Sequence, residues 1–257
     1  MIEAIFVHDG DFFIPTEHAG GPWDPAALHG GAPAALMARA IEAVQPELGM
    51  FVSRITAEFM RPVPMAPLRL ATEVIRPGRK VQLVQASLTA DGTEVARATA
   101  LRIRQAAIDV DVDDGEPPPP PPEQGTRLTD APWRGFGGAM NPRLVAGSVV
   151  DPGPATVWFD LRMPIVAGED PSPLMRAVAA ADFGNGISRV LDFKRHLFIN
   201  PDLTVYLSRS PRGEWIALDS QTFTNRNGIG LAQSRIFDRD GRVGSSLQAL
   251  LLDSRTP

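Results

Sequence analysis

Three polar side chains in the second half of the sequence have types and positions that suit the handling of a water molecule. Asp182 ends an apolar, helix-like run, and Asn200 precedes an alternating, strand-like run that opens on Asp202. Gln248 lies in SSLQALLL, an otherwise apolar final strand, where a buried amide needs hydrogen-bond partners. A carboxylate can take a proton from water, and amide side chains can orient that water. The pattern is therefore compatible with a hydrolytic site.

Each of these residues also has a purely structural interpretation. Asp182 can bond to backbone amides of the turn at 184–186, although the dipole at the end of a helix disfavours an acid there. Asn200 can form an Asx turn with Asp202, and strand alternation allows Gln248 to point outward with Ser246. The residues alone leave both interpretations open.

A second group of polar residues suits substrate binding. His29, Gly30 and Gly31 stand at the start of the first helix-like run, where free backbone N–H groups can polarise a carbonyl and glycine allows close approach. His29 also fits the commoner role of a loop histidine that caps or packs. Arg76, Arg79 and Lys80 lie close enough in sequence to contact phosphates, and a solvated turn is the alternative. We expect all six residues to bind substrate.

Composition excludes several kinds of chemistry. The 257 residues include no cysteine, so disulfides, thiol nucleophiles and cysteine-ligated metals are absent. Four scattered histidines do not suggest a zinc site, and the GxSxG pattern of serine esterases does not occur. A net charge of -5 argues against a nucleic-acid partner. No apolar segment is long enough to cross a bilayer and the N-terminus does not resemble a secretion signal, so we expect a cytoplasmic protein.

The order of periodic runs indicates an internal duplication. The first half has short strands at 4–7 and 11–14, an Ala-rich helix from 28 to 45, and strand-like runs at 51–61, 68–76, 81–89 and 94–103. The second half repeats the plan with a strand at 157–163, a helix that Ser172 caps and Pro173 begins, and runs at 203–209, 215–224, 228–238 and 245–252. This predicts an α+β protein in which each long helix packs on an antiparallel sheet.

The two halves are separated by a segment of different composition. Acidic residues precede six consecutive prolines, which favour an extended polyproline conformation and cannot pair in a sheet. We therefore expect an N-terminal repeat at 1–105, a linker at 106–150 and a C-terminal repeat at 151–257. A ligand for a proline-binding module is the alternative for this segment.

The residues themselves resemble a known family. HGGAPAALMARAIEA, AAADFGNG, FINPDLTVYLSR and GEWIALDSQT are similar to stretches of the double-hotdog acyl-CoA thioesterases of the thioesterase II type. The resemblance implies a double hotdog that hydrolyses acyl-CoA without a metal or cofactor, in which Asp182, Asn200 and Gln248 orient a water. Asn200 departs from the family pattern, because well-known bacterial members carry threonine there. Hotdog proteins of this kind usually associate further, so we expect a homo-oligomer.

The resemblance also implies one active site in each chain. Single-hotdog thioesterases that resemble the His29 loop carry an acid further along the following helix, and here PAALMARA contains none before Glu42. Two other functions stay open. Hotdog hydratases or dehydratases usually place a histidine against the acid, and His196 is the histidine nearest to that region of the sequence. A protein that binds acyl-CoA or fatty acyl groups without turnover is the other alternative.

Overall fold

A computed structural model describes residues 3–111, 115–129 and 133–255 of the chain. The helices are α1 (Gly31–Ala43), α2 (Phe136–Ala139), α3 (Pro173–Ala181) and α4 (Gly184–Ile187), with single 3-10 turns η1 (Glu17–Ala19), η2 (Pro46–Leu48) and η3 (Pro122–Gln124). The strands are β1 (Phe6–Asp9), β2 (Phe12–Pro15), β3 (Met50–Phe59), β4 (Leu68–Arg76), β5 (Val81–Ala90), β6 (Thr93–Arg104), β7 (Thr126–Arg127), β8 (Arg143–Gly147), β9 (Ala155–Asp160), β10 (His196–Ile199), β11 (Asp202–Leu207), β12 (Trp215–Thr224), β13 (Ile229–Asp238) and β14 (Gly241–Ser254). The strands predicted at 68–76 and 215–224 are confirmed to the residue as β4 and β12.

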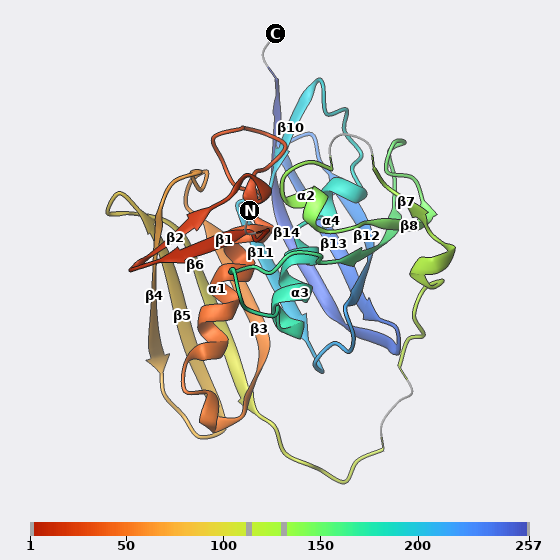
Figure 1. The fold of residues 1–257 in the computed structure, drawn as a ribbon. Coiled ribbons are helices and arrows are strands. Elements are labelled where there is room, and N and C mark those ends of the chain that lie inside the picture. The colour runs from red at the N-terminus through yellow and green to blue at the C-terminus, as the bar shows by residue number, and fades with distance from the viewer. Residues whose placement is uncertain (1–2, 112–114, 130–132, 256–257) are drawn as a thin grey trace.

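The strands form one 14-stranded sheet in the order β1-β2-β4-β5-β6-β3-β11-β14-β13-β12-β9-β8-β7, with β10 paired to β14. The two halves of the chain join where β3 pairs antiparallel with β11. Figure 1 shows the sheet curving around α1 and α3, with the first half in red to yellow and the second in green to blue. Because β3 and β11 pair with each other, neither of them is left as an exposed edge strand.

The strand register repeats at an interval of 148 residues. Leu88 of β5 pairs with Ala96 of β6, and Ile236 of β13, 148 residues later, pairs with Gly244 of β14. Each hairpin has its register shift at the same place, and the residues there, Val95 and Val243, are both buried. At the junction Thr56 pairs with Thr204, again 148 residues later, and their hydroxyls lie 3.1 Å apart. The two meanders are thus related by an approximate twofold axis near this threonine pair.

The two long helices lie side by side and antiparallel on the concave face of the sheet (Figure 1). Both are rich in alanine and nearly all their residues are buried, which permits a close approach. Ser172 caps α3 by accepting from Met175 N, as predicted, and its hydroxyl lies 2.5 Å from Glu42 Oε2 near the end of α1. The start of α1 therefore meets the end of α3, and the start of α3 meets the end of α1.

The segment between the repeats is more ordered than a linker. The prolines at 117–121 lie outside all strands, as expected, and Pro122 begins η3. β8, however, pairs with β9, so the second half of the sheet starts before residue 151. The proline segment also packs on the sheet, because the Pro120 carbonyl accepts from the indole of Trp158 at 2.7 Å and Glu116 forms an ion pair with Arg235. The strand predicted at 157–163 corresponds to β9, which begins earlier, at Ala155.

Candidate active site

Asp182 is the residue on which the candidate site converges. It is the C-cap of α3 and is only 7% exposed. Its Oδ1 accepts from Asn200 Nδ2 at 2.8 Å and from Gln248 Nε2 at 3.1 Å. Its Oδ2 lies 2.9 Å from Nδ1 of His29. The structure thus brings together the three residues predicted to orient water, and adds a histidine from the other half of the chain.

Asn200 and Gln248 reach the carboxylate from two different strands. Asn200 lies between β10 and β11, and its Nδ2 also donates to the Asp202 carbonyl at 3.1 Å. The contact with Asp182 and the contact within the turn therefore occur together. Gln248 is 1% exposed, so the outward orientation allowed by strand alternation is wrong for this residue. Its Oε1 accepts from the backbone N–H of Asn185 at 3.0 Å, which directs the amide nitrogen at Asp182.

Asn185 is a supporting residue that the sequence did not single out. It lies in α4, is 6% exposed, and donates from Nδ2 to the Phe198 carbonyl at 2.9 Å. It therefore ties the segment after Asp182 both to Gln248 and to the strand that precedes Asn200. Its place in the Gly-Asn-Gly turn was visible in the sequence, but its long-range partners were not.

His29 approaches Asp182 from the loop before α1. The imidazole stacks on Phe183 with ring centroids 4.4 Å apart and tilts against Phe136 at 5.3 Å. Its Nδ1 lies 3.2 Å from Gly31 N as well as 2.9 Å from the carboxylate. Nδ1 can accept from Gly31 only when it carries no proton. When Nδ1 is protonated it donates to Asp182, and the Gly31 N–H is then available to the carboxylate.

The two glycines at the start of α1 allow this close packing. A Cβ added to Gly30 would lie 2.9 Å from Asp182 Oδ2 and 3.0 Å from the ring of Phe59. A Cβ added to Gly31 would lie 2.8 Å from the ring of Phe136 and 2.9 Å from the Ala179 carbonyl. The space beside both glycines is thus taken by protein atoms, and the glycines let α1 meet the end of α3.

The surroundings keep the carboxyl group ionised. Burial by itself raises the pKa of Asp182, but the attraction of His29, hydrogen bonds from His29 and Asn200, and the Gly31 N–H together hold that pKa below its ordinary value. A carboxylate at the end of a helix, where the dipole is unfavourable, is therefore stabilised by donors from both halves of the chain.

Arg76, Arg79 and Lys80 do not lie at this site. They occupy the end of β4 and the turn to β5, and all three are exposed. Two residues after Lys80, Gln82 donates to Gln45 Oε1 beyond the end of α1. The turn is therefore at the opposite end of α1 from Gly31, about 20 Å away for a helix of 13 residues. His196, at the start of β10, pairs with Ser254.

The parts of the chain that the structure describes hold no group of three or more His, Cys, Asp or Glu residues placed to bind a metal. No helix in those ranges is long and apolar enough to cross a membrane. Two cavities formed by the described residues, one between the helix ends and one near Arg162, are not lined by Asp182.

Comparison with known proteins identifies the family of the chain. A family model described as the acyl-CoA thioesterase C-terminal domain matches residues 111–252, and one described as the N-terminal domain matches residues 19–103. No curated protein matches the sequence.

Several solved structures are similar over nearly their whole length. A candidate thioesterase II from Thermobifida fusca has a TM-score of 0.78 at 19% identity, covering 96% of this chain and 95% of that one. A hot-dog-fold protein of unknown function from Alicyclobacillus acidocaldarius has a TM-score of 0.74 at 18% identity, covering 98% and 96%. An acyl-CoA thioesterase II from Mycobacterium marinum has a TM-score of 0.66 at 20% identity, covering 90% of each chain. At these identities the similarity establishes the hotdog fold.

Proposed function

The chain belongs to the acyl-CoA thioesterase family, and from that premise we propose that it hydrolyses acyl-CoA thioesters at Asp182. The observation that carries the proposal is the convergence of Asn200, Gln248 and His29 on one buried carboxylate. The proposed architecture is a double hotdog in which the second repeat supplies the acid and the first supplies the histidine loop. Its substrate is an acyl-CoA, and the chain acts as part of a homo-oligomer.

The proposed reaction needs only water and the thioester. Asp182 removes a proton from a water that Asn200 and Gln248 orient, and the water oxygen attacks the carbonyl carbon. The tetrahedral intermediate then collapses, the C–S bond breaks, and the leaving thiolate takes the proton from Asp182. The products are the free acid and coenzyme A. The low pKa keeps the base ionised near neutral pH, at the cost of a weaker affinity for the proton.

Access to the carboxylate requires movement of its neighbours. Asp182 is 7% exposed and Gly30 is covered by the ring of Phe59. We propose that the acyl thioester enters beside Gly30, where displacement of Phe59 would bring its carbonyl to the start of α1. Backbone N–H groups at that helix start would then stabilise the oxyanion.

A thiol-trapping assay tests the proposal. Purified protein is incubated with acyl-CoA substrates of increasing chain length, and release of free coenzyme A is followed. Asp182→Asn removes the base and should reduce kcat/KM by about 10²–10⁴-fold. Asp253→Asn, which changes an exposed carboxylate of β14, is the control and should keep the wild-type rate. Equal rates for Asp182→Asn and wild type would show that Asp182 is not the base.

One observation favours a second candidate function, hydration or dehydration of an acyl thioester. Hotdog hydratases place a histidine against the acid, and Nδ1 of His29 lies 2.9 Å from Asp182 Oδ2. A histidine and a carboxylate together can add water across a double bond. Loss of the ultraviolet absorbance of an enoyl-CoA, without release of coenzyme A, would favour this reaction over hydrolysis.

A further inference from the structure

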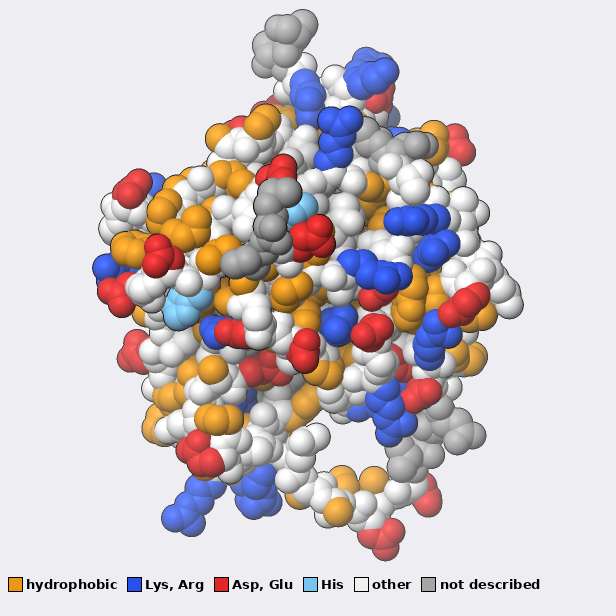
Figure 2. Space-filling view, viewed as in Figure 1, with side chains coloured by type: hydrophobic (Ala, Val, Ile, Leu, Met, Phe, Trp, Pro, Cys, Tyr) orange, Lys and Arg blue, Asp and Glu red, His pale blue; other side chains and the backbone are white. Residues whose placement is uncertain are grey.

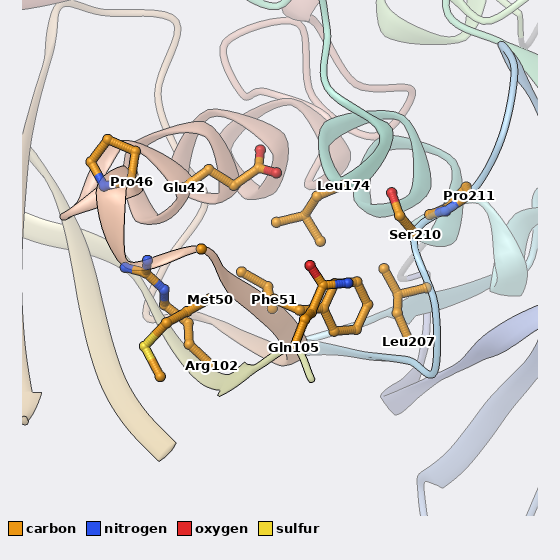
Figure 3. Close-up of a pocket in the computed structure, with 12 residues that line it drawn as sticks. Glu42, Pro46, Met50, Phe51, Arg102, Gln105, Leu174, Leu207, Ser210 and Pro211 are labelled. Carbon is orange, nitrogen blue, oxygen red and sulfur yellow. The ribbon is translucent and has the colours of Figure 1, made fainter. Parts of the chain in front are cut away.

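The other end of the α1–α3 helix pair holds a separate pocket of about 240 Å³. It is formed by the end of α1, the start of α3, the first residues of β3 and the segment after β11 (Figure 3). Phe51, Leu174 and Leu207 give it apolar walls, while Glu42 extends into it from α1 and Gln105 and Ser210 are exposed at its edge. The approximate twofold axis near Thr56 and Thr204 relates this end of the helix pair to the end that holds Asp182.

The pocket lacks the groups that make the Asp182 end suitable for catalysis. Ala100 stands in β6 where Gln248 stands 148 residues later in β14. The C-cap of α1 is Val44, whereas that of α3 is Asp182. Pro173 has no N–H at the start of α3, and Ser172 already accepts from Met175 N. A ligand that binds here meets neither a counterpart of Gln248 nor a free helix start.

The charged residues that line the pocket are Glu42 and Arg102, which have opposite charges. Glu42 accepts from Ser172, and burial raises its pKa, partly offset by that hydrogen bond and by Arg102. Arg102 is 1% exposed and donates through Nη1 to the Val44 carbonyl at 2.5 Å. Its Nε has no hydrogen-bond partner among the residues that the structure describes. A neutral ligand that offers N–H groups, as a secondary amide does, complements the Glu42 carboxyl group without adding charge.

The size of the pocket suits one arm of a larger ligand. Pockets that enclose a drug-sized molecule usually measure about 300–1,000 Å³, so 240 Å³ is enough for a chain with amide groups but not for a nucleotide. The exposed position of Gln105 and Ser210 leaves the rest of such a ligand outside.

Basic residues stand where that outer part would lie. Gln105 follows Arg104, whose backbone N–H donates to the Lys80 carbonyl at 2.9 Å. Arg79 and Lys80, expected from the sequence to bind phosphate, are therefore next to the strand end that borders this pocket. In Figure 2 Lys and Arg side chains project at the lower left, where Figure 1 places the β4–β5 connection. Arginine and lysine are the usual partners of phosphate in proteins.

We propose that this pocket is a second, non-catalytic binding site for a phosphopantetheine arm, the arm that coenzyme A carries. The amide-bearing chain lies between Glu42 and Leu207, and its phosphate lies at Arg79 and Lys80. The choice of this ligand rests on the proposed function, because a phosphopantetheine thioester is what that function would supply. The site itself rests on the pocket, the Glu42–Arg102 pair and the adjoining basic turn.

Calorimetric titration of coenzyme A into the full chain tests the proposal. Ser210→Trp covers the edge of the pocket at an exposed position, and Arg79→Glu with Lys80→Glu reverses the charge of the turn without touching the core. Each should weaken one coenzyme A binding event at least tenfold, and Ser210→Trp should leave kcat unchanged. Arg127→Glu is the control, because Arg127 is an exposed arginine of β7, the strand at the other edge of the sheet, and this variant should bind coenzyme A like wild type.

The results of the titration distinguish coenzyme A binding at this pocket from hydrolysis at Asp182. Equal affinity and stoichiometry in wild type, Ser210→Trp and the charge-reversed variant would overturn the proposal. Octanoate bound in place of coenzyme A, with the same sensitivity to Ser210→Trp, would show that the ligand class is wrong. Binding needs no turnover, so a chain that binds coenzyme A at this pocket but hydrolyses no thioester would support the site and count against the proposed function.

Discussion

His29 and Asp182 lie 153 positions apart in the sequence, and Nδ1 of the first is 2.9 Å from Oδ2 of the second. The histidine belongs to the N-terminal repeat and the acid to the C-terminal repeat. The contact is therefore possible only when α1 and α3 are packed antiparallel.

Replacement of His29 by Gln should change the pH dependence of the reaction. His29 is the main group that lowers the pKa of Asp182 against the effect of burial, so its removal raises that pKa. The acidic limb of the kcat/KM profile, where the carboxylate becomes protonated, should move to higher pH. Profiles of wild type and His29→Gln between pH 3 and 8 measure the shift. The control is His8→Gln, an exposed site, which should keep the wild-type limb.

The contact between His29 and Asp182 should also stabilise the fold, and this stabilisation should depend on pH. A depressed pKa in the folded state stabilises the fold above the pKa of an unfolded aspartate, about 3.9, and this contribution is lost as the pH falls through the folded value. His29→Gln should therefore reduce the free energy of unfolding at pH 7 more than at pH 3. Urea unfolding at both values measures the difference, and an equal reduction at both would contradict it.

Gln248→Ala should reduce both stability and activity. The amide of Gln248 satisfies the buried Asn185 N–H as well as Asp182, so truncation leaves a buried donor without its partner. We expect a loss of about 1–3 kcal/mol in the free energy of unfolding. Gln233→Ala, at an exposed position of the neighbouring strand, should change it by less than about 0.5 kcal/mol. Chemical denaturation of the two variants measures both changes in the free energy of unfolding.

At position 200, activity should depend on whether the side chain can donate a hydrogen bond to Asp182 more than on which side chain supplies that donor. Asn200→Thr keeps a hydroxyl that can donate to Asp182, whereas Asn200→Ala removes the donor altogether. We expect kcat to fall further in Asn200→Ala than in Asn200→Thr. If the two variants hydrolyse acyl-CoA at the same rate, the 2.8 Å contact between Asn200 and Asp182 serves only the local turn.

Gly31→Ala should destabilise the fold because its Cβ would lie 2.8 Å from the ring of Phe136 and 2.9 Å from a carbonyl of α3. Overpacking of this kind costs about 1–3 kcal/mol. Gly186→Ala is a matched control, since a Cβ at that helical glycine would meet nothing within 4 Å. Thermal unfolding should place Gly31→Ala well below wild type and Gly186→Ala at or above it.

The periodic parts of the chain were predictable and the contacts between distant parts were not. Alternation and turn residues located β3–β6 and β11–β14, and the alternation is clearest in β5 and β13, where every second side chain is buried. Asp182 and Gln248 stood out as polar residues in apolar runs. The pairing of His29 with Asp182 depends on how two helices cross, which no local pattern encodes.

The contacts of two segments could not be derived from the sequence. The phosphate contacts expected of Arg76, Arg79 and Lys80 stay a prediction, and these residues lie the length of α1 away from Asp182. The segment at 106–150 was expected to connect the repeats only, yet β8 and the Pro120 carbonyl find partners in the second repeat. Proline content correctly excluded strands at 117–121 but carried no information about what those residues pack against.

The junction of Thr56 with Thr204 has a consequence for how such a protein can change. In a dimer of identical subunits every substitution appears at both symmetry-related places, so neither can be altered without the other. Fusion of the two copies into one chain removes that constraint. Ala100 and Gln248, or Val44 and Asp182, could therefore diverge independently, one end of the helix pair keeping its acid while the other became free to acquire a different use.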